Sequence, residues 1–238
     1  MQPGMTMMKG WIDDLIGMVF PRVCEVCGQS LVHGEEYLCL GCFVGMPRTG
    51  IHRDTFNAVH RRLAGKTPVD RAASMYWYYR QSDYARLIHE AKYRGRPALA
   101  RWLGHRYAAE IKSDGFFDGI DLLLPVPMYF LKRMFRGYNQ AEAIALGVSA
   151  ETGIPVGDNL VARRGHATQT RKDSYGRYLN SRGIYGVRRP EELSGRHLLV
   201  VDDVVTTGAT LLACLDELHA AAPTATLSVL TLAATHLR

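Results

Sequence analysis

The sequence predicts an α/β fold in which a parallel sheet is flanked by helices, with a small cysteine-rich module ahead of it. From residue 72 onward, short apolar runs typical of buried strands alternate with longer stretches of helical spacing. Four of the five cysteines stand within the first fifty residues. A chain of 238 residues, 47% apolar and 22% charged, is also long and apolar enough to bury a full core, which excludes a disordered chain.

Charge and hydropathy narrow the classes of partner. The chain has 29 basic and 23 acidic residues, a net charge of +6 and a pI near 9.1, so we expect an anionic partner. The most apolar N-terminal stretch, 11–20, is interrupted by Asp13 and Asp14. It is too short to span a bilayer and has no small-residue cleavage site. We therefore expect a cytoplasmic protein without membrane insertion.

Two CxxC pairs form the strongest local signal. Cys24 with Cys27, and Cys39 with Cys42, are separated by eleven residues. Each pair can place two thiolates on one turn of backbone, and two such turns complete a tetrahedron around Zn²⁺. Four cysteine ligands leave no open coordination position, so the predicted zinc is structural; two disulfides are the alternative and would require an oxidising compartment. Cys214 lies in an apolar helical pattern and is expected in the core.

The composition along the chain indicates three parts. Residues 1–50 hold the cysteine module, preceded by a short amphipathic helix expected at 8–20. Residues 51–70 are basic and polar, and we interpret them as a linker. Residues 71–238 form the α/β domain.

Each expected strand of this domain is a short apolar or aromatic run, and each helix repeats apolar residues three and four positions apart. In chain order we expect a strand at 75–79, two helices within 84–112 separated by Gly95 and Pro97, a strand at 121–126, a helix at 139–152, a short strand within 154–161, a strand at 197–201, a helix at 210–222 and a strand at 226–232.

The clearest candidate for chemistry is the junction at 197–210. An apolar strand ends in Asp202 and Asp203, a turn rich in threonine follows, and a helix then begins. Ligands of open α/β sheets bind beyond the carboxyl ends of the strands. The turn offers N–H groups, hydroxyls and a helix N-terminus to a phosphate, and the carboxylates suit ribose hydroxyls or hydrated Mg²⁺. A solvated strand end with a threonine-rich cap is the alternative. The predicted phosphate-binding residues are Thr206, Thr207, Gly208, Ala209 and Thr210.

This junction resembles the phosphoribosyl-diphosphate signature of type I phosphoribosyltransferases, and the rest of the chain is similar to the ComF family of competence-associated proteins. Tyr138 stands where phenylalanine is more usual, and the loop at 168–170 lacks the commoner Thr-x-x-Gln spacing. The matching segments are the cysteine ribbon with Phe20 and Pro21 ahead of it, 89–95, 125–127, 136–140, 168–170 with Arg177 and Asn180, and 201–210.

The resemblance implies a type I phosphoribosyltransferase fold with an N-terminal zinc finger, and binding of phosphoribosyl diphosphate with Mg²⁺. Asp202 and Asp203 would be catalytic and would hold the ribose hydroxyls, while the turn at 206–210 would hold the 5′-phosphate. The candidates for the pyrophosphate are Lys92, Arg133, Arg136 and Arg177. The sequence shows no obvious base for an incoming nucleophile, so the acceptor stays open.

Two functions are compatible with these residues. The first is an enzyme that transfers the phosphoribosyl group to an acceptor. The second is a non-catalytic protein that binds a nucleotide or single-stranded DNA in natural transformation, in contact with DNA-uptake or helicase components. Fold alone does not choose between them. The segment 163–189 carries eight basic residues and one acid, and it suits a flap over pyrophosphate, a nucleic-acid track or a solvated basic loop.

Overall fold

The computed structural model covers most of the chain. The helix expected at 8–20 lies outside the described residues, and so does most of the basic segment 163–189. The described residues are 22–63, 67–93, 96–163 and 183–236.

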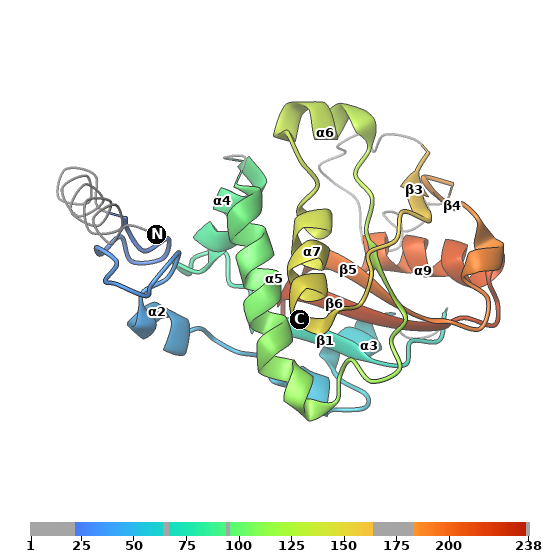
Figure 1. The fold of residues 1–238 in the computed structure, drawn as a ribbon, viewed down its shortest axis with the longest axis horizontal. Helices are drawn as coiled ribbons and strands as arrows, with labels where there is room; N and C mark the ends of the chain where they lie inside the picture. Colours follow the sequence, from blue (N-terminus) through green and yellow to red (C-terminus); the bar gives the residue numbers. More distant parts are fainter. Residues whose placement is uncertain (1–21, 64–66, 94–95, 164–182, 237–238) are drawn as a thin grey trace, which may run out of the picture.

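A four-stranded parallel sheet in the order β1–β6–β5–β2 forms the centre of the molecule (Figure 1). A second, two-stranded antiparallel sheet pairs β3 with β4. The α/β architecture predicted from the alternating pattern is therefore confirmed. The strands are β1 (Ala72–Trp77), β2 (Leu122–Pro125), β3 (Leu160–Ala162), β4 (Tyr185–Val187), β5 (His197–Val205) and β6 (Thr226–Ala234).

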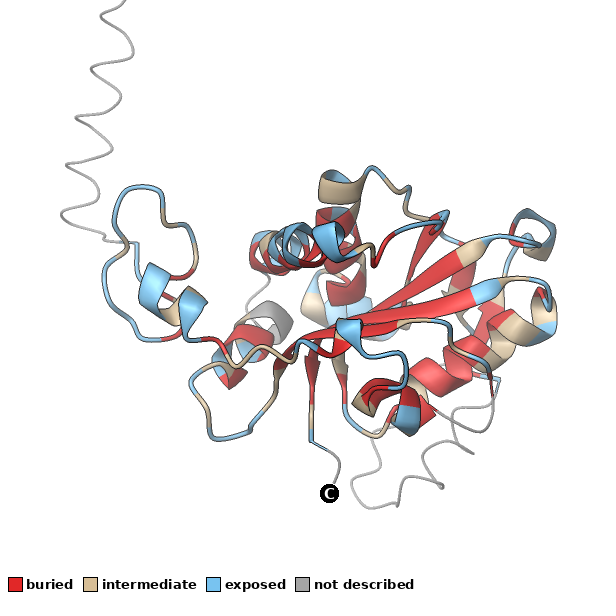
Figure 2. Ribbon diagram, turned by 90° about the horizontal axis from the view of Figure 1, so that it is seen from below, coloured by how far each residue is buried: buried red, intermediate tan, exposed pale blue. Residues whose placement is uncertain are grey.

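Helices cover both faces of the parallel sheet, and the buried residues follow the strands and the helix faces turned toward them (Figure 2). Helices α5 and α7 share one core cluster with Leu199 and Val201 of β5, whereas α3 and α9 share the other with Leu198 and Val200. No helix in the described ranges has both the length and the apolar content that crossing a bilayer requires. The α-helices are α2 (Leu40–Val44), α3 (Ala58–Leu63), α4 (Ala85–Tyr93), α5 (Pro97–Ile111), α6 (Phe130–Arg136), α7 (Gln140–Thr152) and α9 (Ala209–Ala221). Three short 3-10 helices cover Ile51–Arg53, Lys112–Asp114 and Pro190–Glu192.

Strand β5 is longer than expected. The apolar run predicts a strand at 197–201, but the strand continues to Val205 because β6 pairs with it as far as Ala234. Asp202 and Asp203 are therefore part of the strand near its carboxyl end rather than the first residues after it. Partner pairing, which a single segment does not reveal, sets this boundary.

Two glycines allow α5 and α7 to approach each other closely. A Cβ atom at Gly147 would lie 2.0 Å from the carbonyl oxygen of Arg101, and one at Gly104 would lie 2.4 Å from that of Ile144. Helix α7 is thereby held against α5 on one side and against β2 and β5 on the other. This packing fixes the start of α7, which forms part of the cleft described below.

The segment 51–70, interpreted from its composition as a linker, contains a 3-10 helix and α3. Ile51, Val59 and Leu63 are buried in the core beneath the sheet. Asn57 is 3% exposed, and its Nδ2 donates to the carbonyl of Ala72 at the start of β1 at 2.8 Å. A few apolar side chains and one amide are enough to attach the segment, although most of its exposed residues are polar or charged.

The cysteine module packs against α5. Cys24 belongs to the same core cluster as residues of α5. The ring centroids of Tyr37 and Phe43 lie 5.6 and 6.0 Å from that of Trp102 in edge-on contacts, and the hydroxyl of Tyr84 donates to the carbonyl of Cys42 at 2.8 Å. The module is therefore joined to the α/β domain by aromatic packing.

Candidate functional site

A cleft of about 1410 Å³ opens at the carboxyl ends of the parallel strands. Its walls come from the segments that follow β1 and β2, from the start of α7, from the end of β5 with the turn after it, and from the residues after β6. Arg62 of α3, Arg136 of α6 and Tyr185 of β4 are also among the lining residues. The cleft thus lies where the sequence analysis expects a ligand, beyond the carboxyl edge of the sheet.

The two carboxylates of β5 line this cleft from different sides. Side chains alternate along a strand. Burial raises the pKa of the Tyr185 phenol on the α9 side, and the nearby Cys214 and Asp202 raise it further. Burial, together with Asp203, raises the pKa of Tyr138 to about 12 on the α7 side. The two carboxylates therefore present negative charge to both sides of the floor of the cleft.

Backbone N–H groups orient both carboxylates. Oδ1 of Asp202 accepts a hydrogen bond from the N–H of Asp203 at 2.9 Å, and Oδ1 of Asp203 accepts one from the N–H of Val204 at 2.7 Å. This arrangement is suited to ribose hydroxyls, which need acceptors held in place before they arrive.

The turn after β5 forms a small hollow of about 30 Å³ in front of α9, lined by Asp202, by Val204 and by the seven residues that follow it. Gly208 adopts φ = 77° and is the N-cap residue of α9, a helix of 13 residues. A Cβ at this position would lie 3.0 Å from Cδ2 of Leu63. The turn can wrap toward an anion and α3 can pack against it because residue 208 is glycine.

Arg62 supports the same region from α3. Its Nη1 donates to the carbonyl of Val205 at 3.0 Å and to Oγ1 of Thr235 at 3.4 Å, so it joins the ends of β5 and β6. Burial lowers its pKa. Sequence reasoning missed Arg62 because it lies in the segment interpreted as a linker, and no motif marks it.

The predicted pyrophosphate candidates are not all brought together. Arg136 lines the cleft. Arg133 is not among the lining residues, and its Nη2 lies 3.4 Å from a carboxylate oxygen of Glu142. Lys92 belongs to α4, but its side chain lies outside the described part of the structure, as does all of Arg177. Of Arg133 and Arg136, the two candidates whose side chains the structure describes, only Arg136 lines the cleft.

Aromatic residues that the sequence analysis did not select form one end of the cleft. Tyr79 and His236 line it, and the Tyr79 hydroxyl lies 2.7 Å from Nε2 of His236. The imidazole also stacks on Trp77 with ring centroids 4.1 Å apart. These residues follow or end β1 and β6, and only the strand order β1–β6–β5 places them beside the threonine turn. Nothing in the separate segments predicts that order.

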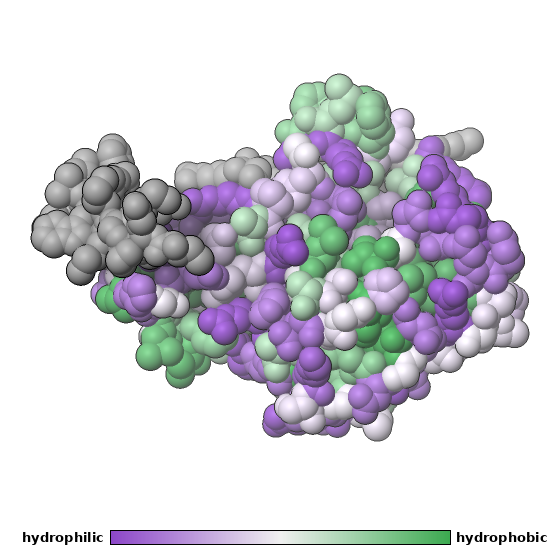
Figure 3. Space-filling model, in the orientation of Figure 1, coloured by the Kyte–Doolittle hydropathy of each residue, from purple (hydrophilic) through white to green (hydrophobic). Residues whose placement is uncertain are grey.

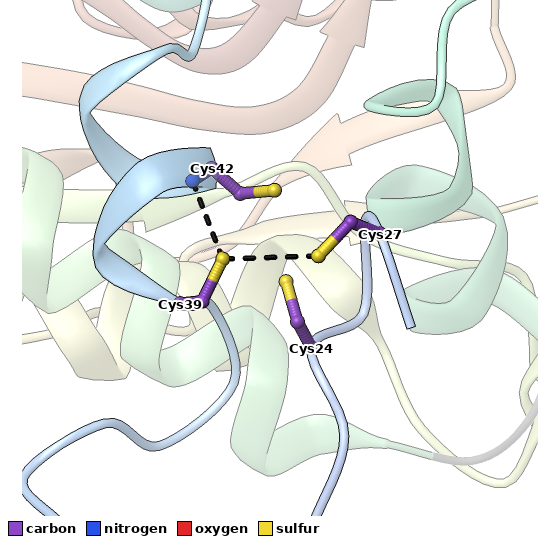
Figure 4. A group of neighbouring side chains, drawn as sticks. All are labelled: Cys24, Cys27, Cys39 and Cys42. Carbon is purple, nitrogen blue, oxygen red and sulfur yellow. Dashed lines mark hydrogen bonds between the residues drawn. The ribbon is translucent and has the colours of Figure 1, made fainter. Parts of the chain in front are cut away.

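The four cysteines of the module point toward a common centre (Figure 4). Their sulfur atoms all lie within 4.8 Å of one another, and those of Cys27 and Cys39 are 3.8 Å apart. Zn–S bonds of about 2.3 Å in a tetrahedron place the sulfurs about 3.8 Å apart, so the cluster fits a metal ion. All five cysteines of the chain are free, which is inconsistent with the alternative of two disulfides.

Local electrostatics favour a cation among the sulfurs. Burial opposes ionisation of Cys24, but backbone N–H groups of Cys27, Cys39 and Val26 outweigh it and lower the pKa of the thiol to about 7. Burial and the neighbouring sulfurs raise the pKa of Cys42 well above its usual range. A bound metal ion would relieve this crowding, because thiolates are its ligands.

The parallel sheet, the paired carboxylates and the glycine-containing turn define a phosphoribosyltransferase-like protein, and the comparisons agree. The family model "Phosphoribosyl transferase domain" matches residues 106–236. "DNA utilization protein YhgH" of Escherichia coli K12 is 28% identical over 197 residues, which cover 79% of this chain and 80% of that protein. The protein of the same name from Salmonella typhimurium is 27% identical over 203 residues, with the same coverage.

A further relative carries the name that the resemblance anticipates. "Competence protein F" of Haemophilus influenzae is 34% identical over 93 residues, which cover 38% of this chain and 41% of that protein. The chain belongs to the ComF family of proteins with a phosphoribosyltransferase domain. The family predicted from the sequence is thereby confirmed, together with the type I phosphoribosyltransferase fold.

Proposed function

We propose that this protein binds phosphoribosyl diphosphate with Mg²⁺ in the cleft and transfers the phosphoribosyl group to an acceptor. The observation that carries the proposal is that the β5 carboxylates and the turn with its 30 Å³ hollow line one cleft. A sugar that carries anionic groups at both ends needs acceptors in the middle and donors at each end. The lining of this cleft includes both kinds of group: carboxylates on β5, and donors on the turn after it and on Arg136.

Each part of the ligand has candidate partners. The turn at 206–210 would bind the 5′-phosphate through N–H groups and hydroxyls, and Asp202 and Asp203 would bind the ribose hydroxyls. Arg136 would bind the pyrophosphate, whose charge Mg²⁺ partly neutralises. Departure of pyrophosphate leaves a cationic ribose, so catalysis depends on positioning and on stabilising charge as it separates.

Calorimetry with phosphoribosyl diphosphate and Mg²⁺ tests this proposal. Replacing Asp202 and Asp203 together with asparagine should weaken binding at least about tenfold, because hydrogen bonds to charged groups contribute about 1.5–3 kcal/mol each. The matched control replaces Asp54 and Asp118, two exposed aspartates that do not line the cleft, and it should bind as the wild type does. No binding by the wild type, or equal affinity in both double variants, would refute the proposal.

The four-cysteine cluster would hold Zn²⁺ as a structural ion. The sulfur separations support this, and four thiolates leave no position for a substrate. A reducing cytoplasm, where thiols persist, is the compartment that fits such a site.

A second candidate function is binding of single-stranded DNA, favoured by the surface of α6. Phe130 and Phe135 are 67% and 91% exposed, and Arg133 and Arg136 stand between or beside them. Figure 3 shows this apolar surface at the tip of the molecule, above the cleft-forming end of α7. Exposed aromatic rings interleaved with cations are typical of surfaces that stack bases and follow a phosphate backbone. The printed names of the relatives support a role in DNA uptake or use, in contact with other components of that process.

Fluorescence anisotropy with a labelled oligothymidylate tests the second candidate. Replacing Phe130 and Phe135 with alanine should weaken binding at least about fivefold, since one stacked base contributes about 1–3 kcal/mol. The matched control is Phe56→Ala, which removes a phenylalanine that is 60% exposed and lies outside the cleft. Affinity should also fall with salt, with a log–log slope of about −0.7 for each phosphate contacted. Absence of binding at low salt would exclude this function.

A further inference from the structure

Two hydroxyl groups are buried inside the parallel sheet. Ser74 of β1 and Thr231 of β6 are both 0% exposed. Within the described part of the chain, neither Oγ of Ser74 nor Oγ1 of Thr231 has a hydrogen-bond partner. A buried hydroxyl without a partner is costly, because it gives up its hydrogen bonds to water when the chain folds. These two groups therefore call for a ligand that the described residues do not supply.

The strand register places both hydroxyls in one row with a carboxylate of the cleft. Thr231 pairs with Ser74 on one side and with Asp202 on the other. The row crosses β1, β6 and β5, which are neighbours in the sheet (Figure 1). Side chains of residues paired in this way point to the same face of a parallel sheet. Ser74, Thr231 and Asp202 thus form one polar row.

Helices α3 and α9 cover the face on which this row lies. Two residues earlier along the same strands, Ala72, Val229 and Val200 form a row that belongs to the core cluster shared with α3 and α9. Side chains two positions apart on a strand share a face. Asp202 also lines the cleft. One end of the polar row therefore reaches the proposed ligand site, and the other end is enclosed in the core.

The spacing across the row suits water. Neighbouring strands are about 4.8 Å apart. A water oxygen that makes two hydrogen bonds of about 2.8 Å joins polar atoms up to about 5.6 Å apart. Buried waters in proteins make about three hydrogen bonds each, to groups that otherwise have no partner. Water therefore fits between Ser74 and Thr231 and again between Thr231 and Asp202.

We propose that Ser74 and Thr231 bind a short chain of buried water that ends on the Asp202 carboxylate, and that Thr231 is thereby a positioning residue for the ribose contact. The positioning role rests on the proposed binding of phosphoribosyl diphosphate, whereas the water site does not. The Thr231 hydroxyl stands in the middle of the row and can donate toward one neighbour while it accepts from the other. Water that donates to Asp202 adds to the hydrogen bond from the Asp203 N–H and fixes the carboxylate before ribose arrives.

Oxygen-17 magnetic relaxation dispersion, which counts long-lived internal water, tests the site without a ligand. Thr231→Val replaces the hydroxyl with a methyl group, and it should lose at least about one water per chain relative to the wild type, as should Ser74→Ala. Thr231→Ser keeps the hydroxyl and should retain the water.

The matched control is Ser228→Ala, which removes another buried hydroxyl of β6. Its Oγ lies 2.8 Å from Nε2 of His197 and accepts from the Arg71 N–H at 3.1 Å, so its loss should leave the count of internal water unchanged. A wild-type count in both Thr231→Val and Ser74→Ala would overturn the water site.

Denaturant unfolding distinguishes bound water from two unpaired hydroxyls. If the hydroxyls share water, Ser74→Ala and Thr231→Val should each lower the denaturation midpoint. The double variant should then lose less than the two shifts added, because the first change already releases water. Removing an unpaired hydroxyl would instead raise the midpoint. A raised or unchanged midpoint in either single variant, or additive losses in the double variant, would contradict the proposal.

Two further readouts test the positioning role. Without ligand, the carboxyl-carbon chemical shift of Asp202, assigned with Asp202→Asn, should move in Thr231→Val and stay in place in Thr231→Ser. Affinity for phosphoribosyl diphosphate with Mg²⁺ should fall at least about fivefold in Thr231→Val and stay within about twofold in Thr231→Ser and Ser228→Ala. An unmoved Asp202 signal or an unchanged affinity in Thr231→Val would refute the positioning role. Absence of binding by the wild type, with the water and the Asp202 response intact, would refute only the proposed function.

Discussion

Gly208 is the residue on which the phosphate turn depends most directly. At φ = 77° an L side chain is strained, and its Cβ would also meet Leu63 at 3.0 Å. Gly208→Ala should therefore lower stability by about 1–2 kcal/mol and weaken phosphoribosyl diphosphate binding at least tenfold, which denaturant unfolding and calorimetry measure. Gly153 is the matched control, with the same φ of 77° and nothing within 4 Å of a Cβ. Gly153→Ala should show the loss of stability without the loss of binding, and equal binding losses would contradict this account.

Sequence analysis predicted the candidate site residues that belong to one contiguous motif. Asp202, Asp203 and the threonine turn follow one another in the chain, and their local pattern is enough to place them at a strand end. Arg62 and His236 belong to no local motif. Arg62 lines the cleft from α3, and His236 lines it from the residues after β6. Their contribution follows from the order of β1, β6 and β5, which depends on tertiary packing and has no local signature.

The attachment of α3 to the sheet depends on Asn57. Its Nδ2 donates to the carbonyls of Ile51 at 2.9 Å and Ala72 at 2.8 Å, and its Oδ1 accepts from the N–H groups of Val59 and His60 at the start of α3. Asn57→Ala should lower the free energy of unfolding by about 2–3 kcal/mol, because it removes a helix cap and leaves buried carbonyls unpaired. Chemical denaturation measures this.

A second variant separates the cap from the attachment. Asn57→Asp keeps the acceptor for the α3 N–H groups but removes the three hydrogen bonds that Nδ2 donates, to the carbonyls of Ile51, Asp54 and Ala72. If the attachment matters, this variant should still be destabilised and should bind phosphoribosyl diphosphate more weakly, since α3 supports Gly208 through Leu63 and Arg62. Wild-type stability in Asn57→Asp would show that 51–70 behaves as the linker its composition suggested. The polar surface of this segment concealed its buried face from sequence reasoning, and the domain boundary there stays a prediction.

At the scale of the whole molecule, the cysteine module packs against helix α5 of the α/β domain. Cys24, Val26 and Leu38 are buried in the same core cluster as residues of α5. Arg48 adds an ion pair to Glu110 of α5 at 2.8 Å. The spacing of the cysteines predicted the cluster itself. That it packs on α5 could not be predicted, because Tyr37, Phe43 and Trp102 are unremarkable residues until the fold brings them together.

The last prediction concerns the metal. Purified protein should contain about one zinc ion per chain, and Cys39→Ser should lose it, because three thiolates bind less tightly than four and Cys39 also caps α2. Hydrogen exchange should then rise in the module and on the face of α5 that carries Trp102, while the sheet keeps its protection. His33→Ala is the control, since His33 is exposed and lies between the two pairs without belonging to the cluster. Zinc retained in Cys39→Ser would show that Cys39 is not a ligand, and unchanged exchange on the Trp102 face of α5 would show that the aromatic contacts do not join the module to the domain.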